Sequence, residues 1–351
     1  MGLPQINIEF SGKAVSAVER SARGIVALIL KDATGTFDVK EYRSIEEIKV
    51  EDWTPANIDY IKKAFMGTPA KVICERLDTA ESDYSEVLTR LGFKKWNYLA
   101  IPDLENATDI ETWLKGKREN GKKTFKAVLP NASTGDHEGI INFTTTDIKV
   151  GDKTYTTAEY CCRIAGVLAG LPFTRSATYY VLPEVEGITE STTPDSDIES
   201  GKLILVNDGE KIKIGRAVNS LVSTTVSKTE DFKKIKIVEV MDMVKDDIRD
   251  TFNNNYIGKV NNIYDNQVLF FTSVNAYFKG LAGDEIFDRN FQNKADVDVE
   301  AQRLAWEGIG TDVSQLSDQE VKEKSFRSNV YAKANVKIVD AMEDLDFSIA
   351  I

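Results

Sequence analysis

The sequence has 351 residues, of which 42% are hydrophobic and 28% are charged, a composition typical of folded proteins. Its formal net charge of −12 argues against a general nucleic-acid binder and against binding to an anionic membrane surface, since both need clustered Lys and Arg. No apolar run reaches the roughly 18 residues of a membrane-spanning helix, and the first residues lack the basic start and apolar core of a secretory signal, so no membrane insertion is expected.

The first predicted element is a strand at residues 6–11, INIEFS. Ile6, Ile8 and Phe10 share one face and polar residues share the other, which is typical of a half-buried β-strand. Between about residues 20 and 145, strands then alternate with helices, which favours a mainly parallel α/β sheet. The expected strands are 24–32, 69–77, 97–103, 123–131 and 139–145. The expected helices are 57–67, 83–93 and 109–120.

The middle of the chain changes in character. Residues 158–170 predict a helix whose Ala, Gly and Cys content allows close packing, and the polar segment 185–202 predicts a loop or a domain boundary. Two strands around Asn207-Asp208-Gly209 should form a hairpin. A long helix is expected over 235–258, because apolar residues recur there at three- and four-residue spacing.

The C-terminal part should contain another helix near 295–308, followed by the segment 330–340 and a last strand. The final residues, LDFSIAI, alternate as the first strand does. Their apolar face carries Leu345, Phe347, Ile349 and Ile351. Chain ends are usually frayed unless something holds them. Each terminal strand therefore either pairs within its own domain or adds to the sheet of a neighbouring copy.

Cysteine and histidine usage limits the possible chemistry. Cys74, Cys161 and Cys162 are odd in number and two are adjacent, so buried free thiols in a reducing cytoplasm are expected instead of a disulfide framework. His137 is the single histidine and lies in STGDHEG, which predicts a surface turn. A metal site with two histidines is excluded, and a catalytic role for His137 is not indicated.

Motifs for enzymes are missing from the sequence. It contains no Gly-rich phosphate loop with Lys and Ser/Thr, no GxGxxG after a strand and no GxSxG. The segment DSDIESG at 195–201 resembles the start of a calcium loop, but its Gly is one place late and Val206 stands where the bidentate Glu is needed. No catalytic, cofactor-binding or metal residue is predicted, and no cofactor is expected.

Two further acidic groups have structural explanations. Residues 296–300, DVDVE, are expected at a helix start, where the helix dipole favours acids. Asp246, Asp247 and Asp250 should lie on the solvated face of the long helix. The informative features that remain are the two terminal strands and the acidic composition, and both point to assembly.

The C-terminal half resembles a contractile tail sheath protein. The resemblance is carried by GKLILVNDGEKIKIGRAVNSLVS, by DFKKIKIVEVMDMVKDDIRDTFNNNYIGKVNN and by the closing VKIVDAMEDLDFSIAI. The start, INIEFSGKAVSAVERSARGIVALILKD, is similar to the start of the same family. These proteins form the sheaths of myophages and R-type bacteriocins, and this chain resembles the compact Gram-positive prophage type. The motifs are diffuse, so their order along the chain gives the specificity.

The resemblance implies a fold and a domain organisation. The fold class is α/β (α+β), with an outer, mainly parallel α/β domain at 21–150 and a C-terminal α+β core domain at 151–339. Residues 1–20 and 340–351 would be arms that extend as strands to neighbouring subunits and complete their sheets. The receiving sheet would lie in the C-terminal domain and include residues 202–221, with hinges near Ser11-Gly12 and in DAMED at 340–344.

The resemblance also implies function and partners. Subunits would polymerise as stacked hexameric rings around an inner tail tube protein, with a baseplate and a tail terminator at the ends. Contraction would drive the tube through a cell envelope without nucleotide. A helix at 296–308 would contact the tube through Gln302, Arg303 and Trp306, although core packing of Trp306 explains that residue equally well. The sheath would assemble in the bacterial cytoplasm and leave on lysis.

Two alternatives stay open at this point. An α/β enzyme that uses a nucleotide or a sugar would need a ligand pocket, and a non-contractile oligomeric shell protein would assemble without contraction.

Overall fold

The computed structural model describes residues 18, 24–132 and 134–350. Its chain forms two compact units. We call residues 24–243 with 340–350 the sheet unit, and residues 244–339 the helical unit. None of the helices within these ranges is both long enough and apolar enough to cross a membrane.

A seven-stranded sheet forms the centre of the sheet unit, with the order β10-β6-β5-β4-β1-β3-β2. Its strands are β1 Ile25–Lys31, β2 Val39–Tyr42, β3 Lys71–Leu77, β4 Tyr98–Ala100, β5 Lys126–Pro130, β6 Ile140–Phe143 and β10 Lys202–Leu203. Neighbours pair in parallel, apart from β2, which is antiparallel to β3. The predicted mainly parallel α/β sheet is therefore confirmed, and β2 was not predicted.

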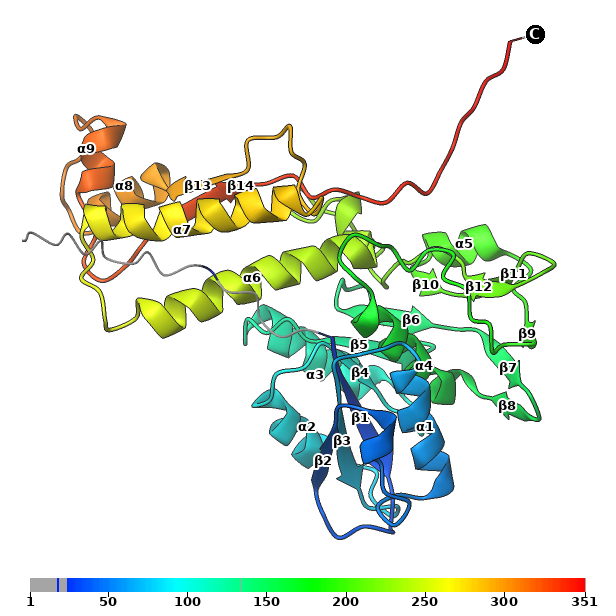
Figure 1. The fold of residues 1–351 in the computed structure, drawn as a ribbon. Helices are drawn as coiled ribbons and strands as arrows, with labels where there is room; N and C mark the ends of the chain where they lie inside the picture. The colour runs from blue at the N-terminus through cyan, green and yellow to red at the C-terminus, as the bar shows by residue number, and fades with distance from the viewer. Residues whose placement is uncertain (1–17, 19–23, 133, 351) are drawn as a thin grey trace, which may run out of the picture. The chain divides into compact units, whose positions relative to one another are not determined.

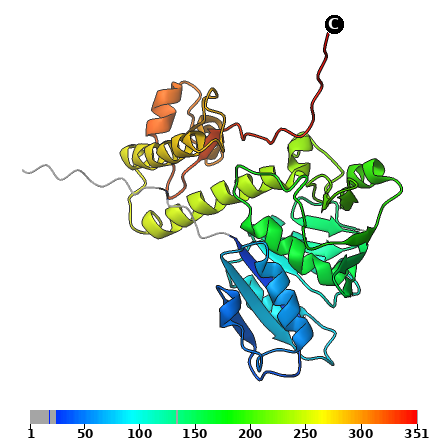
Figure 2. The ribbon, with the colours of Figure 1, turned by 45° about the vertical axis from the view of Figure 1, so that its right-hand side comes forward.

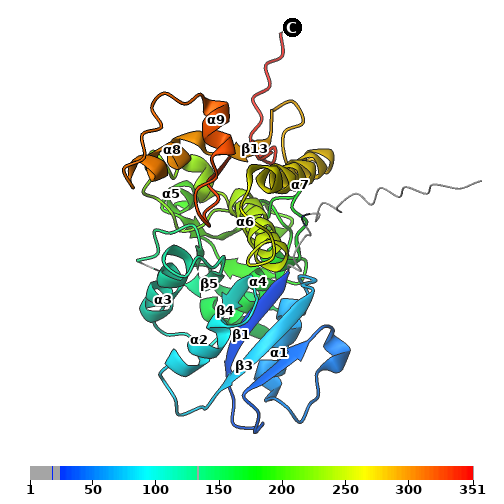
Figure 3. The ribbon, with the colours of Figure 1, turned by 90° about the vertical axis from the view of Figure 1, so that its left-hand side faces the viewer.

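Helices cover both faces of this sheet. Alternate residues of β1 point to opposite sides, so Leu28 packs in one core cluster and Ile29 in the other. Figures 1 and 3 show α1 on one side of the strands and α2 and α3 on the other. The helices are α1 Pro55–Phe65, α2 Ser85–Gly92, α3 Thr108–Glu119 and α4 Thr157–Gly170, with α4 in the cluster of α1.

Helix α4 packs closely against the end of α1, as its small residues predicted. A Cβ added to Gly166 would lie 2.0 Å from the carbonyl oxygen of Ala64, and one added to Gly170 would lie 1.8 Å from that of Gly67. No larger side chain fits at these two positions. Cys74, Cys161 and Cys162 are free and buried, which confirms that prediction.

Smaller elements complete the sheet unit. The segment 185–202, predicted as a loop or a domain boundary, contains the strand β9 and the helix α5, while the hairpin around Asn207-Asp208-Gly209 is confirmed. These elements are η1 Ile45–Glu47, β7 Thr146–Val150, β8 Lys153–Tyr155, β9 Gly187–Thr189, α5 Pro194–Glu199, β11 Leu205–Asn207, β12 Ile212–Ile214 and η2 Glu230–Lys233. In α5, Asp197 accepts from Ser191 and pairs with Lys202.

The domain boundary expected at 150/151 falls inside this compact unit. Helix α4 packs on the sheet, and β10 extends the sheet by pairing in parallel with β6. Both elements lie after residue 150, so residues 24–150 do not close their own core.

A buried ion cluster anchors the start of α6, Ile235–Asn255, on the sheet unit. The Asp242 carboxylate accepts two hydrogen bonds from Arg118, at 2.9 and 3.1 Å, and one from Lys126, at 3.0 Å. Lys126 also pairs with Glu239 at 2.8 Å. Burial disfavours the charged carboxylate, but the two cations outweigh that cost and lower the pKa of Asp242 to about 2.

His137 is buried, so the predicted surface turn is wrong for this residue. Its main-chain amide lies 3.3 Å from the Ser220 hydroxyl, and that hydroxyl donates to the His137 carbonyl at 3.1 Å. The ring accepts from Gly139 through Nδ1. Burial lowers the pKa of His137 to about 4, so the ring is neutral near pH 7. The turn is covered by a segment distant in sequence, which no local pattern reveals.

The helical unit contains residues 244–255 of α6, three further helices and a two-stranded sheet. The further elements are α7 Tyr264–Gly283, β13 Lys294–Val297, α8 Val299–Glu307, α9 Asp318–Glu323 and β14 Ala332–Asn335. Phe278, Leu281 and Phe287 form part of its core. The helix expected at 295–308 begins only at Val299, because 294–297 pair with β14 and Asp298 caps the helix.

The acidic face of α6 is not solvated as predicted. Asp246 and Asp247 are buried, and Asp250 is half-buried. Tyr277 of α7 donates to Asp247 at 2.6 Å, and Arg249 pairs with Asp246 at 2.6 Å. Helix α7 covers this face, which explains the difference.

Candidate assembly interface

The C-terminal residues extend without pairing to any described strand. Figures 1 and 2 draw the red C-terminal segment as an extended trace outside any helix or strand. Leu345, Phe347 and Ile349 are 85%, 76% and 74% exposed. Large apolar side chains in such a row are normally covered, because each gains about 1.5–3 kcal/mol on burial. The sequence predicted a half-buried strand here, and within this chain nothing described buries it.

The linker before these residues is held, although it was expected to be a hinge. Asp340 pairs with Lys234. Glu343 accepts from the hydroxyls of Ser176, at 2.9 Å, and Thr178, at 2.6 Å. These contacts place the free part of the arm after Asp344 instead of within 340–344.

The β13–β14 sheet of the helical unit has one covered edge and one exposed edge. It has two antiparallel strands, and a two-stranded sheet alone is marginally stable in water. On the outer edge of β13, the Asn275 side chain of α7 forms two hydrogen bonds with the main chain of Ala295. It accepts from the Ala295 amide at 2.7 Å and donates to the Ala295 carbonyl at 3.0 Å. That edge is therefore covered by this chain.

The outer edge of β14 has the opposite character. All four of its residues are exposed. The amide of Asp298 donates to the Tyr331 carbonyl at 3.0 Å, which sets the ladder so that the main-chain groups of Ala332 and Ala334 point away from β13. An extended segment could therefore pair along this edge. Sequence reasoning missed β14 because Ala, Lys and Asn are poor strand formers.

The region 202–221, expected to receive strands, is largely paired within the sheet unit. Residues 180–182 pair with the outer edge of β12. The Leu182 amide donates to the Ile212 carbonyl, and the Ile214 amide donates to the Tyr180 carbonyl, each at 2.9 Å. An arriving strand would have to displace this segment.

Helix α8 carries the three residues predicted to touch a tube, and each has partners inside the helical unit. Gln302 is fully buried, and its amide donates to the carbonyls of Val321 and Lys324. Arg303 donates to the carbonyls of Val313 and Leu316. The Trp306 indole N–H donates to the Lys324 carbonyl at 2.9 Å, and the ring packs edge-on against Phe326. These contacts are structural, and the tube contact stays a prediction.

Four other predicted contact residues lie outside the described residues. They are Ile6, Ile8 and Phe10 of the N-terminal arm and Ile351 at the C-terminus.

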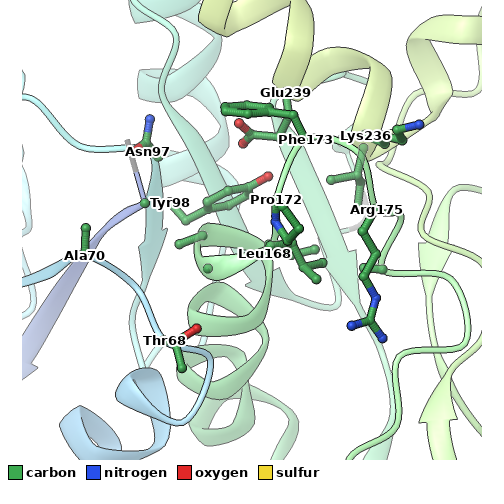
Figure 4. Close-up of a pocket in the computed structure, with 16 residues that line it drawn as sticks. Thr68, Ala70, Asn97, Tyr98, Leu168, Pro172, Phe173, Arg175, Lys236 and Glu239 are labelled. Carbon is green, nitrogen blue, oxygen red and sulfur yellow. The ribbon is translucent and has the colours of Figure 1, made fainter. Parts of the chain in front are cut away.

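The pockets of the sheet unit bear on the enzyme alternative. One pocket of about 270 Å³ is lined by Asn97, Tyr98, Phe173 and Lys236 among others (Figure 4). Its wall includes Gly24 and Asn97, which immediately precede β1 and β4. The pocket thus lies at the amino ends of the strands, whereas open α/β sheets bind ligands at the carboxyl ends.

The recess at the carboxyl ends does not favour a nucleotide. It is lined by Asp103, Glu105 and Glu111, whose negative charges would repel phosphate. Among the described residues, no group of three or more His, Cys, Asp or Glu side chains is placed to hold a metal ion.

The fold is that of a tail sheath protein, and comparisons establish the family. Residues 79–220 match the phage tail sheath protein central domain, and residues 227–351 match the phage tail sheath C-terminal domain. The tail sheath protein of Clostridium phage phiCD119 is 38% identical over 99% of both chains. This chain belongs to the phage tail sheath protein family, which confirms the resemblance.

Solved structures agree on the fold. The sheath tail protein from Desulfitobacterium hafniense superposes with a TM-score of 0.71 at 16% identity, covering 84% of this chain and 94% of that chain. The helical sheath of the anti-feeding prophage in its contracted state gives a TM-score of 0.71 at 12% identity, covering 100% of this chain and 99% of that chain. The chain is thus a tail sheath protein by sequence and by fold.

Proposed function

We propose that this chain polymerises as stacked hexameric rings around an inner tail tube protein and contracts to drive the tube through a cell envelope. Residues 1–20 and 340–351 are the arms that link neighbouring subunits. A baseplate and a tail terminator bound the polymer. The subunits assemble in the bacterial cytoplasm and leave on lysis.

The observation that carries this proposal is the exposed apolar row Leu345, Phe347 and Ile349 together with the open edge of β14. An extended segment with alternating apolar residues and a strand edge without a described partner are complementary, as in strand addition between chains. We propose β14 of a neighbouring copy, in place of residues 202–221, as the acceptor.

The energetics suit a reversible link. Burying three large apolar side chains gains roughly 5–9 kcal/mol, and each strand hydrogen bond adds about 1 kcal/mol. Ordering the arm costs about 1–2 kcal/mol per residue, so one arm is only modestly favourable. Several arms engaged together multiply the strength of the mesh. Contraction is then driven by greater contact between subunits, with the tube holding the extended state.

Negative-stain electron microscopy of the full chain beside a variant lacking 345–351 tests the proposal. We expect striated tubes from the full chain alone, or from the full chain co-expressed with its tube protein. A matched control, Val226→Ser, removes a fully exposed apolar residue away from the arm and should assemble normally. Identical tubes from the truncated variant would contradict the role of the arm.

A further inference from the structure

The acidic linker 340–344 rests in a seat on the sheet unit. We define the seat as Ser176, Thr178, Arg216 and Lys234. Lys234 pairs with Asp340 at one end of the linker, and Arg216 pairs with Asp344 at the other. Between them Glu343 turns inward, with its side chain only 8% exposed.

The Glu343 carboxylate has more partners than a surface ion pair. One oxygen receives the Ser176 and Thr178 hydroxyls at 2.9 and 2.6 Å, and the other lies 3.8 Å from the Arg216 guanidinium. Thr178 is itself held, because its hydroxyl accepts from the Ala217 amide at 3.0 Å. Hydrogen bonds to an ionised group in such a sheltered place are about twice as strong as neutral ones.

The electrostatics of the two cations agree with this contact. The hydrogen bond to Asp344 raises the pKa of Arg216, and the hydrogen bond to Asp340 raises the pKa of Lys234. Met342, between Asp340 and Glu343, is fully exposed and belongs to no contact of the seat. Residues 345–350 have no such contacts.

We propose that this seat fixes the point from which the C-terminal arm leaves, so that a pull on the arm is transmitted to the sheet unit at residues 176–178, 216 and 234. In the helical unit, the Val339 amide donates to the Ile286 carbonyl at 2.9 Å. The next residue, Asp340, already contacts the seat. The arm is then mechanically part of the sheet unit. The consequence for neighbouring copies rests on the proposed function.

A spin label at position 342 tests the seat directly in the full chain. The chain's three cysteines are buried, so a thiol reagent should modify Met342→Cys selectively. In the monomeric fraction of the otherwise unchanged chain, the rotational motion of the label should be slow. Glu343→Ala and Arg216→Ala should each raise the ratio of released to seated linker by roughly tenfold to a hundredfold. Glu343→Gln keeps acceptors for the hydroxyls and should fall between.

Lys202→Ala is the matched control, because Lys202 is as exposed as Arg216 and pairs with Asp197 away from the linker. It should leave the label slow. A label that stays slow in Glu343→Ala, or that is released equally by Lys202→Ala, overturns the seat. Glu343 lies after the last described strand, so its truncation removes no part of the core.

Assembly gives a second readout that separates the two proposals. With Glu343→Ala, the protein concentration needed for tubes should rise about tenfold, in line with the loss of a pre-positioned arm. Normal assembly together with a released label overturns the inference that the seat directs the arm. Normal assembly without 345–351 overturns the proposed function of the arm, while the label experiment still decides whether the seat exists.

Discussion

The seven-stranded sheet and the β13–β14 sheet differ in how far this one chain covers them. The seven-stranded sheet of the sheet unit carries helices from the same chain on both faces, and its β1 is almost entirely buried. The two-stranded sheet of the helical unit has one edge occupied by Asn275 and one edge, on β14, with four exposed residues. The first sheet has both faces covered by its own chain, whereas the second exposes the edge strand β14.

This difference corresponds to two kinds of apolar pattern in the sequence, one for the folded core and one for the exposed arm. Residues that complete the first sheet form long buried runs, which any single chain needs. The arm at 345–350 exposes apolar residues that no described part of its own chain covers. Our proposal assigns the cover of this segment to a neighbouring copy.

The largest loss of stability is expected from a substitution in the core of the sheet unit. Asp242→Ala leaves the buried cations Arg118 and Lys126 without their shared carboxylate and should lower the free energy of unfolding by about 3–5 kcal/mol. Denaturant unfolding of the monomer measures it. Asp152→Asn, at an exposed turn, is the control and should change stability by less than about 0.5 kcal/mol. A cost for Asp242→Ala as small as that of the control would contradict the anchoring role.

A pH dependence follows from the single histidine. The folded-state pKa of His137 is about 4, below its ordinary value of 6.5, so the unfolded chain binds the proton first as pH falls. Stability is therefore full above pH 6.5 and is lost on the way down to about pH 4, by about 2 kcal/mol between pH 7 and 5. Denaturant titrations at several pH values should show this slope and its loss in His137→Asn. An unchanged slope in that variant would rule this explanation out.

Gln302→Ala tests whether α8 is internally packed. Its buried amide satisfies carbonyls at the end of α9, so the variant should destabilise the protein by about 1–3 kcal/mol. Thermal unfolding compares it with Leu304→Ala, on the exposed side of the same helix, which should be nearly neutral. Full stability combined with loss of tube binding would instead assign Gln302 to the tube.

The smallest change in monomer stability is expected from a substitution in the exposed C-terminal arm. Phe347→Ser should change the free energy of unfolding by less than about 0.5 kcal/mol, because the Phe347 ring is mostly exposed in the folded chain. The same variant should strongly reduce tube formation. A destabilised monomer would mean that the arm packs on its own chain.

Much of the sheet unit could be predicted from the sequence. Buried runs such as 25–31 and the Asn-Asp-Gly turn are local signals, and the structure confirms them. Helix α7 was not predicted, although Phe270, Val274, Tyr277 and Leu281 recur at three- and four-residue spacing. Strands β2, β13 and β14 have four residues each and include polar ones, which is too little pattern for a prediction.

The candidate interface divides in the same way. Alternation in LDFSIAI predicts the arm, because the pattern lies in neighbouring residues. The seat for Glu343 joins residues 165 and 167 positions apart, and the burial of His137 depends on Ser220, 83 positions away. Contacts of this kind appear only once the fold is known.

Disulfide trapping between copies tests strand exchange most directly. One chain carries Ala334→Cys on the β14 edge, and a second carries a single cysteine at each position from 345 to 350 in turn. Residues opposite each other in paired strands have Cβ atoms about 4.5–5.5 Å apart, close enough for a disulfide. The account predicts a crosslinked dimer from mixed tubes at one or two alternate positions. Tubes that give no dimer at any position, or a link only within a chain carrying both cysteines, would contradict it.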